Sequence, residues 1–151
     1  MGKPIAPAKQ LAGFIAKFDP AIARLIRSCR VALRKQLPTA IELVYDNYNF
    51  FVIGYCSTPR ASDCVVSLAA NSKGVGLSFY YGATLPDPTK RLHGSGSQNR
   101  FIRLPTAATL SEPDVKALIR AALAQAKTPM PASGRGVTVI QSISAKQRPR
   151  R

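Results

Sequence analysis

Apolar residues recur at helical spacing in two segments near the N-terminus. Between Pro20 and Leu37, five apolar residues fall within one third of the helix circumference: Ile22, Leu25, Ile26, Cys29 and Leu33. The opposite side carries Arg24, Arg27, Arg30, Arg34 and Lys35. Asp19 followed by Pro20 is typical of an N-cap with proline at the first helical position. Pro38 ends this helix, and a shorter helix is expected over residues 11–18. The pattern therefore predicts an amphipathic helix with one core face and one basic face.

A capping pattern predicts a third helix near the C-terminus. The run Ser111-Glu112-Pro113-Asp114 offers a hydroxyl N-cap, a proline near the start and a carboxylate at the third helical position. Apolar residues then line one face as far as Lys127, and the prolines of residues 128–131 end the helix. Because each long helix has one apolar face, we expect Ile26 and Leu118 to lie in the core.

Six segments are rich in β-branched and aromatic residues, which predicts strands. They span residues 41–45, 49–55, 64–69, 75–81, 100–104 and 137–143. The first four are joined by short turns without helices, so they must pair antiparallel. Residues 82–99 are too rich in glycine and proline for regular structure. This order predicts an α+β fold, with an antiparallel sheet of about five or six strands packed on one face by two N-terminal helices and one C-terminal helix.

The length of 151 residues suits one domain. We divide the chain into a loose N-terminus (1–10), an α+β domain (11–127), and a proline-rich connection with a short strand and a basic tail (128–151). The longest apolar run, residues 50–56, is far shorter than the roughly 20 residues that a membrane-spanning helix needs. The first residues also lack the pattern of a signal peptide. We therefore expect a cytoplasmic protein with no membrane partner.

The three cysteines, Cys29, Cys56 and Cys64, are odd in number and contain no CxxC pair. His93 is the only histidine, so the chain cannot assemble the four soft or imidazole ligands of a typical zinc site. We predict three reduced thiols, no metal site and no cofactor. The alternative is contact between Cys56 and Cys64, which flank a seven-residue connection and can meet across a hairpin.

Charge is the unusual global property, because 22 Lys and Arg face seven Asp and Glu for a net charge of +15. Such an excess favours association with polyanions and says nothing about the fold. With no recognition motif present, nucleic acid would be bound through its phosphates, independently of sequence. A solvated surface, or a tail folded along the sheet, is the alternative. The candidate nucleic-acid residues are Arg24, Arg27, Arg30, Arg34, Lys146, Arg148, Arg150 and Arg151.

Two polar clusters interrupt the apolar strands. The first is Tyr45-Asp46-Asn47-Tyr48-Asn49, and the second is the loop from His93 to Arg100. This loop contains neither a G-x-S-x-G nucleophile elbow nor a G-x-G-x-x-G dinucleotide fingerprint. We therefore predict no catalytic residue and a protein that is not an enzyme. The backbone N–H groups of the loop, with Arg100 beside them, are suited to holding an anion.

Pockets gather a few polar groups in an apolar wall, so we predict that the two clusters converge on one concave surface. The alternative is that they form Asx-turns and ordinary connections between strands. The candidate residues for an unidentified small ligand or anion are Tyr45, Asp46, Asn47, Tyr48, Asp63, Gly94, Ser95, Gly96, Gln98 and Arg100.

Several of these features occur together in a known family. The helical pair, YDNYN, Ser62-Asp63, the LPDP segment, the Gly-Ser-Gly loop with RFIRL, and the closing SAKQRPRR resemble the YdhG-like family, a bacterial domain of unknown function. The resemblance covers residues 10–127 and implies an α+β fold with an antiparallel sheet. It also implies, for some members, a frataxin-like iron chaperone, although the acids of this chain are scattered singly, whereas iron needs clustered oxygen ligands.

The sequence thus favours a non-enzymatic module that binds a small ligand or an anion. Sequence-independent association with nucleic acid is the alternative, and iron delivery is the weaker one. The sequence leaves the ligand, the pathway and the oligomeric state open.

Overall fold

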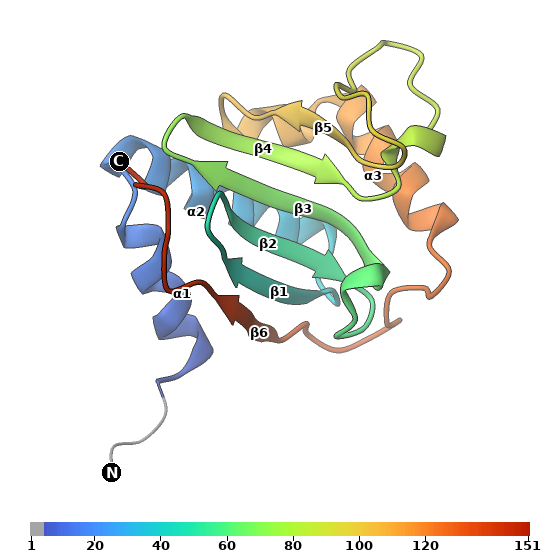
Figure 1. The fold of residues 1–151 in the computed structure, drawn as a ribbon. Coiled ribbons are helices and arrows are strands. Elements are labelled where there is room, and N and C mark those ends of the chain that lie inside the picture. The colour runs from blue at the N-terminus through green and yellow to red at the C-terminus, as the bar shows by residue number, and fades with distance from the viewer. Residues whose placement is uncertain (1–4) are drawn as a thin grey trace.

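A computed structural model describes residues 5–151 (Figure 1). The helices are α1 (Pro7–Ala16), α2 (Pro20–Gln36) and α3 (Pro113–Gln125), and the strands are β1 (Ile41–Asp46), β2 (Phe51–Cys56), β3 (Cys64–Asn71), β4 (Gly74–Phe79), β5 (Arg100–Arg103) and β6 (Thr138–Ile143). Three short 3-10 helices lie between them: η1 (Ala61–Asp63), η2 (Gly82–Thr84) and η3 (Ala107–Ser111). Each helix of the described part is too short or too polar to traverse a lipid bilayer.

The strands form one six-stranded sheet in the order β5-β4-β3-β2-β1-β6, and the helices cover one of its faces (Figure 1). The α+β fold is therefore confirmed. The strands from β1 to β5 pair antiparallel in sequence order, whereas β6 pairs parallel with β1. A parallel pair needs a long connection that returns the chain to the same end of the sheet, and the segment after α3 provides it.

The starts of two helices differ from the sequence prediction. Helix α1 begins at Pro7 and ends at Ala16, so it starts before the predicted residue 11. The predicted N-cap at Ser111 is wrong, because Glu112 occupies the N-cap of α3. Proline at the first helical position holds the preceding residue in an extended conformation, and Glu112 has φ −65° and ψ 137°. Ser111 instead closes η3.

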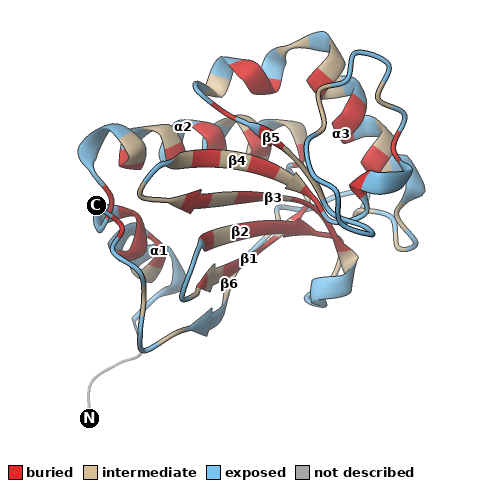
Figure 2. Cartoon of the chain, turned by 45° about the horizontal axis from the view of Figure 1, so that its top comes forward, coloured by how far each residue is buried: buried red, intermediate tan, exposed pale blue. Residues whose placement is uncertain are grey.

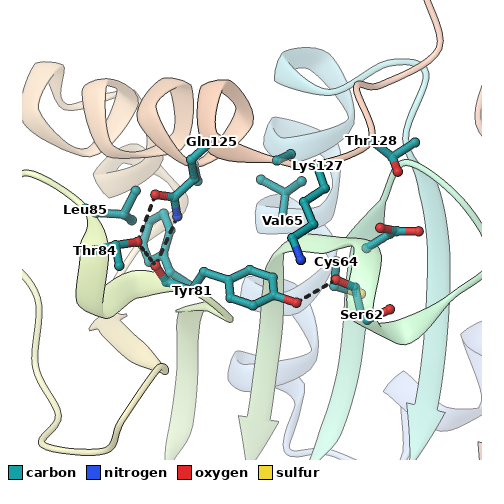
Figure 3. A pocket seen from close by; sticks show the side chains of 13 residues that line it. Ser62, Cys64, Val65, Tyr81, Thr84, Leu85, Gln125, Lys127 and Thr128 are labelled. Carbon is teal, nitrogen blue, oxygen red and sulfur yellow. Dashed lines mark hydrogen bonds between the residues drawn. The ribbon is translucent and has the colours of Figure 1, made fainter.

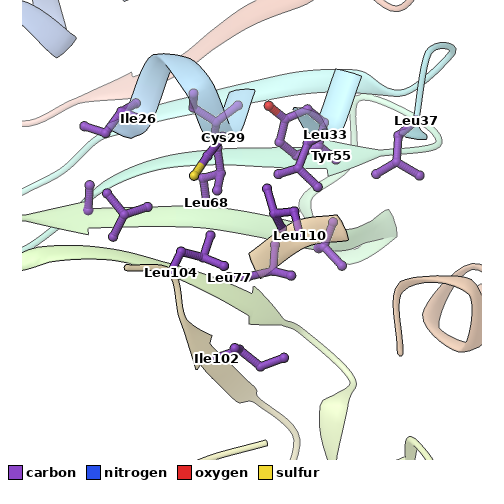
Figure 4. Close-up of a cluster of buried hydrophobic side chains, with 14 of the residues drawn as sticks. Ile26, Cys29, Leu33, Leu37, Tyr55, Leu68, Leu77, Ile102, Leu104 and Leu110 are labelled. Carbon is purple, nitrogen blue, oxygen red and sulfur yellow. The ribbon is translucent and has the colours of Figure 1, made fainter. Parts of the chain in front are cut away.

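The core lies between the helices and the covered face of the sheet (Figures 2 and 4). Ile26 and Leu118, on the apolar faces of α2 and α3, are 1% and 3% exposed, which confirms both predicted core faces. Cys29 of α2 also lies in this core as an unpaired thiol (Figure 4). Burial raises the pKa of that thiol to about 11, so it stays protonated and unreactive near neutral pH.

The prediction of three reduced cysteines is wrong, because a disulfide joins Cys56 and Cys64. The two residues face each other where the end of β2 pairs with the start of β3. Gly54 leaves room for the bridge, since a Cβ at that position would lie 2.7 Å from the Cys64 sulfur. The pairing register therefore brings together two cysteines that the sequence only shows to be separated by a short connection.

Candidate functional site

A cavity of about 180 Å³ lies between the end of α3, η2 and the start of β3 (Figure 3). Most of its wall is apolar, and a few polar groups interrupt it. The lining residues are Ser62, Asp63, Cys64, Val65, Phe79, Tyr81, Thr84, Leu85, Ala122, Gln125, Ala126, Lys127 and Thr128. Of the residues predicted from the sequence to bind a ligand, Asp63 is the one in this wall.

Hydrogen bonds tie the walls of the pocket together (Figure 3). The Tyr81 hydroxyl donates to the Ser62 carbonyl at 2.9 Å. The Gln125 side chain donates to the Tyr81 carbonyl at 3.0 Å and accepts from the Thr84 hydroxyl at 2.9 Å. These contacts join α3, η2 and η1, so the pocket is formed before any ligand arrives.

Lys127 follows the end of α3, and its ammonium group extends into the pocket toward Ser62 (Figure 3). Within residues 5–151, no carboxylate lies within 4.0 Å of this ammonium group. The carboxylate of Asp63 is held by the Thr58 hydroxyl at 2.6 Å. The pocket thus combines one cation without an ion-pair partner with an apolar wall, which suits a ligand with an anionic head and an apolar body.

The YDNYN segment comprises the last two residues of β1 and the turn that follows, and the C-terminal tail of the chain packs against it. Asp46 is fully buried and accepts from Lys17 Nζ at 2.7 Å and from Arg150 Nη2 at 2.9 Å. The same Arg150 Nη2 donates to the Asn47 carbonyl at 2.6 Å. The Arg150 guanidinium also lies 5.9 Å from the Phe18 ring centroid. The YDNYN segment therefore binds an arginine of the same chain, Arg150.

Neighbouring tail residues extend this contact. Gln147 donates to the Asp46 carbonyl at 2.8 Å, and the Arg148 N–H donates to the Tyr48 carbonyl at 2.8 Å. The Arg148 guanidinium lies 5.7 Å from the Tyr48 ring centroid. Burial acts to raise the pKa of Asp46, but the hydrogen bonds from Lys17 and Arg150 outweigh it and hold that pKa below its ordinary value of 3.8. The tail is therefore folded against the sheet rather than solvated.

The Gly-Ser-Gly loop lies at the opposite corner of the sheet (Figure 1). Asp46 pairs with Phe51 at the turn of the β1–β2 hairpin. Arg100 pairs with Phe79, the last residue of β4, at the opposite end of the strands. Strand β5 is also four strands away from β1. The prediction that the two clusters share one concave surface is therefore wrong, because an antiparallel meander carries them apart.

Within that loop the side chain of Arg100 stabilises the loop itself. Its guanidinium donates to the carbonyls of Gly96 at 2.6 Å and Asn99 at 2.8 Å. The remaining candidate residues of the loop are exposed: Gly94, Ser95, Gly96 and Gln98.

The predicted basic stripe of α2 divides into two groups. Arg24 and Arg27 are exposed, as is Lys35. Arg30 and Arg34 instead donate to the buried carboxylate of Glu42. In the tail, Arg150 is buried, whereas the other three candidates are exposed: Lys146, Arg148 and Arg151.

Glu42 is the second buried carboxylate of the described chain, 2% exposed on β1. Arg30 donates to both of its oxygens at 2.9 Å, and Arg34 donates at 3.1 Å. The hydroxyls of Tyr55 and Thr138 add bonds of 3.0 and 2.8 Å. Burial acts to raise the pKa of Glu42, but the bonds from Arg30 and Thr138 and the charges of both arginines hold it below its ordinary value. This cluster links α2 and β6 to β1 through side-chain hydrogen bonds.

The sequence analysis did not single out the other pocket residues, Tyr81, Gln125 and Lys127 among them. Tyr81 was assigned to a strand end and Lys127 to a helix end, and neither position carries a recognisable pattern. No group of three or more His, Cys, Asp or Glu side chains suited to a metal is present within residues 5–151.

Comparisons with family models, curated proteins and solved structures found no match to this chain, so the resemblance to the YdhG-like family stays a prediction.

Proposed function

We propose that this protein is a non-enzymatic binding module for a small carboxylate with an apolar body. The observation that carries the proposal is the Lys127 ammonium group in a mainly apolar, hydrogen-bonded pocket. A ligand carboxylate would pair with Lys127, and its apolar body would lie against Val65, Leu85 and Ala122. The volume of about 180 Å³ is below the roughly 300–1,000 Å³ of typical ligand pockets, which favours a small ligand.

Benzoate and isovalerate are suitable probes, with benzamide and isovaleramide as neutral controls of the same shape. We expect both acids to bind more tightly than their amides, because only the acids form a charge-assisted hydrogen bond with Lys127. Lys127→Met should weaken binding of the acids by up to about fivefold, since Lys127 is exposed and an exposed ion pair contributes up to about 1 kcal/mol. Isothermal titration calorimetry measures both comparisons.

Lys116→Met is the matched control, because Lys116 lies on α3, outside the lining of the pocket. It should leave affinity for the acids unchanged. Ala126→Leu, at a partly exposed position in the wall, should reduce binding of acids and amides alike by filling the cavity. Equal affinity of acid and amide, or equal loss in the two lysine variants, would overturn the proposal.

A sequence-independent polyanion-binding function is the second candidate, favoured by the outer surface of α2. This helix contains no acidic residue, and Arg24, Arg27 and Lys35 are exposed on it without a carboxylate in ion-pair distance among the described residues. Arg30, Arg34 and Arg150 are already bonded to buried carboxylates, so they contribute less to such a surface.

On this second candidate, replacing Arg24, Arg27 and Lys35 with glutamine should make the slope of log affinity against log salt for duplex DNA shallower by up to about 2.7. The control triple variant Arg60→Gln, Lys73→Gln and Arg135→Gln removes the same charge elsewhere. Fluorescence anisotropy over a series of salt concentrations measures both slopes. A slope that changes equally in the two triple variants would show that net charge alone, and not the α2 surface, is responsible.

A further inference from the structure

A second hollow, of about 330 Å³, lies between the segment preceding β5 and the start of α3. It shares no lining residue with the pocket that contains Lys127. Its lining includes Lys90, Arg91, His93, Arg103 and Glu112. Lys90, Arg91 and His93 from one segment and Arg103 from another thus line the same hollow. We propose that this hollow binds a phosphate group.

The segment that carries Lys90 is held by Asp87. The Asp87 carboxylate accepts the backbone N–H groups of Arg91 at 2.8 Å and Leu92 at 2.9 Å, and its carbonyl accepts the N–H of Lys90 at 3.1 Å. Lys90 has φ 55°, the one positive value at a non-glycine residue in the described chain. Such conformations cost free energy and cluster at active sites, ligand clamps and switch regions.

Hydrogen bonds hold two further residues of the hollow, Arg91 and His93. Arg91 Nη1 donates to Glu112 at 2.6 Å and to Asp114 at 3.1 Å. His93 exchanges two backbone hydrogen bonds with Phe101, at 2.9 and 3.0 Å, and their rings lie 5.7 Å apart. Arg103 lies at the end of β5. The positive side chains therefore come from a fixed loop and a strand.

The charges of the lining residues indicate which class of ligand the hollow would bind. Lys90 and Arg103 have no carboxylate within ion-pair distance in residues 5–151, whereas Glu112 is already paired with Arg91. The lining thus has two cations without partners, which match the charge of about −1.5 to −2 on a phosphate monoester at pH 7. Arginine and lysine are the side chains that bind phosphate oxygens, by paired hydrogen bonds and by point charge respectively.

The first test is titration with inorganic phosphate at pH 7.5 and low ionic strength, followed by NMR chemical shifts of the His93 ring. We expect saturable shifts with phosphate that chloride at the same ionic strength does not produce. Lys90→Gln with Arg103→Gln should weaken phosphate binding at least tenfold. The control double variant Lys73→Gln with Lys116→Gln removes the same charge outside the hollow and should bind as the wild type does.

Further arms identify the source of the phosphate. Adenosine monophosphate compared with adenosine tests a nucleotide, and a 5′-phosphorylated duplex compared with the 5′-hydroxyl duplex tests a nucleic-acid end. Tighter binding of the phosphorylated member of either pair, lost in the Lys90/Arg103 variant, supports the site. Equal weakening in both double variants, or unchanged His93 signals, overturns it. Lys127→Met should leave phosphate binding unaltered, so this test is independent of the carboxylate pocket.

Discussion

Asp46→Asn is expected to lower the free energy of unfolding by about 3–5 kcal/mol, because it leaves the guanidinium of Arg150 buried without its carboxylate. Asp46 is fully buried and the Arg150 side chain is 3% exposed, so water cannot replace the lost partner. The Nε of Arg150 already has no hydrogen-bond partner, which makes the remaining bonds of this side chain more important. Urea unfolding at pH 7 measures the change.

The control is Asp19→Asn, an exposed carboxylate at the N-cap of α2 that makes no capping hydrogen bond with its side chain. It should change stability by less than about 0.5 kcal/mol. The double variant Asp46→Asn with Arg150→Met should be less destabilised than the sum of the single variants, because the two side chains interact directly. A loss for Asp46→Asn as small as that of the control would show that the tail is not held by this ion pair.

Acid should weaken the same contact in the wild type. The pKa of Asp46 is lower in the folded chain than its ordinary value of 3.8. A carboxylate with a lowered pKa stabilises the fold fully above its unfolded pKa, and that contribution is lost as the pH falls through the folded pKa. Stability of the wild type should therefore decline on acidification, and Asp46→Asn should flatten the decline.

Glu42→Gln is expected to destabilise the fold by about 2–3 kcal/mol, the second largest effect. The substitution keeps the shape of the side chain but removes the charge to which Arg30 and Arg34 are bonded. The loss is smaller than for Asp46, because these two arginine side chains are 26% and 34% exposed and can turn toward water. Thermal and urea unfolding should agree on the size of the effect.

Glu112→Gln provides the matched comparison for Glu42→Gln. Glu112 also pairs with an arginine, Arg91, but its side chain is 45% exposed. Exposed ion pairs contribute roughly 0–1 kcal/mol, so this variant should stay close to the wild type. If the two glutamine variants lose equal stability, the buried cluster around Glu42 is not a specific fastening of α2 to the sheet.

Local patterns predicted most of the fold. The apolar spacing of α2 determines its core face, and the proline after Asp19 fixes its start, because both depend on residues within one or two turns. The strand segments were predictable for the same reason, since β-branched and aromatic residues with short polar turns act locally. The cap of α3 was predicted one residue early, because Pro113 constrains Glu112 more strongly than the Ser111 hydroxyl attracts the helix start.

The candidate sites depended on contacts between distant residues. The sequence singled out YDNYN and the C-terminal tail as separate candidates for external ligands, yet Asp46 and Arg150 bind each other across more than a hundred residues. Lys127 and Ser62 are also distant in the sequence but line one cavity. Lys90 and Arg103 lie on different segments and line another. No local pattern marks such pairs, because their proximity follows from strand order and from the path of the chain after α3.

By itself the sequence determined the order of the main helices and strands, the core faces of the helices and the large positive charge, since these follow from composition and from periodicity along the chain. Only the tertiary structure decided how that charge is distributed. In the folded chain Arg30, Arg34 and Arg150 pair with the two buried carboxylates. Burial of Glu42 and Asp46 is tolerated only with such positive partners beside them. The tertiary structure also joined Cys56 to Cys64, because the register of β2 and β3 places them opposite each other.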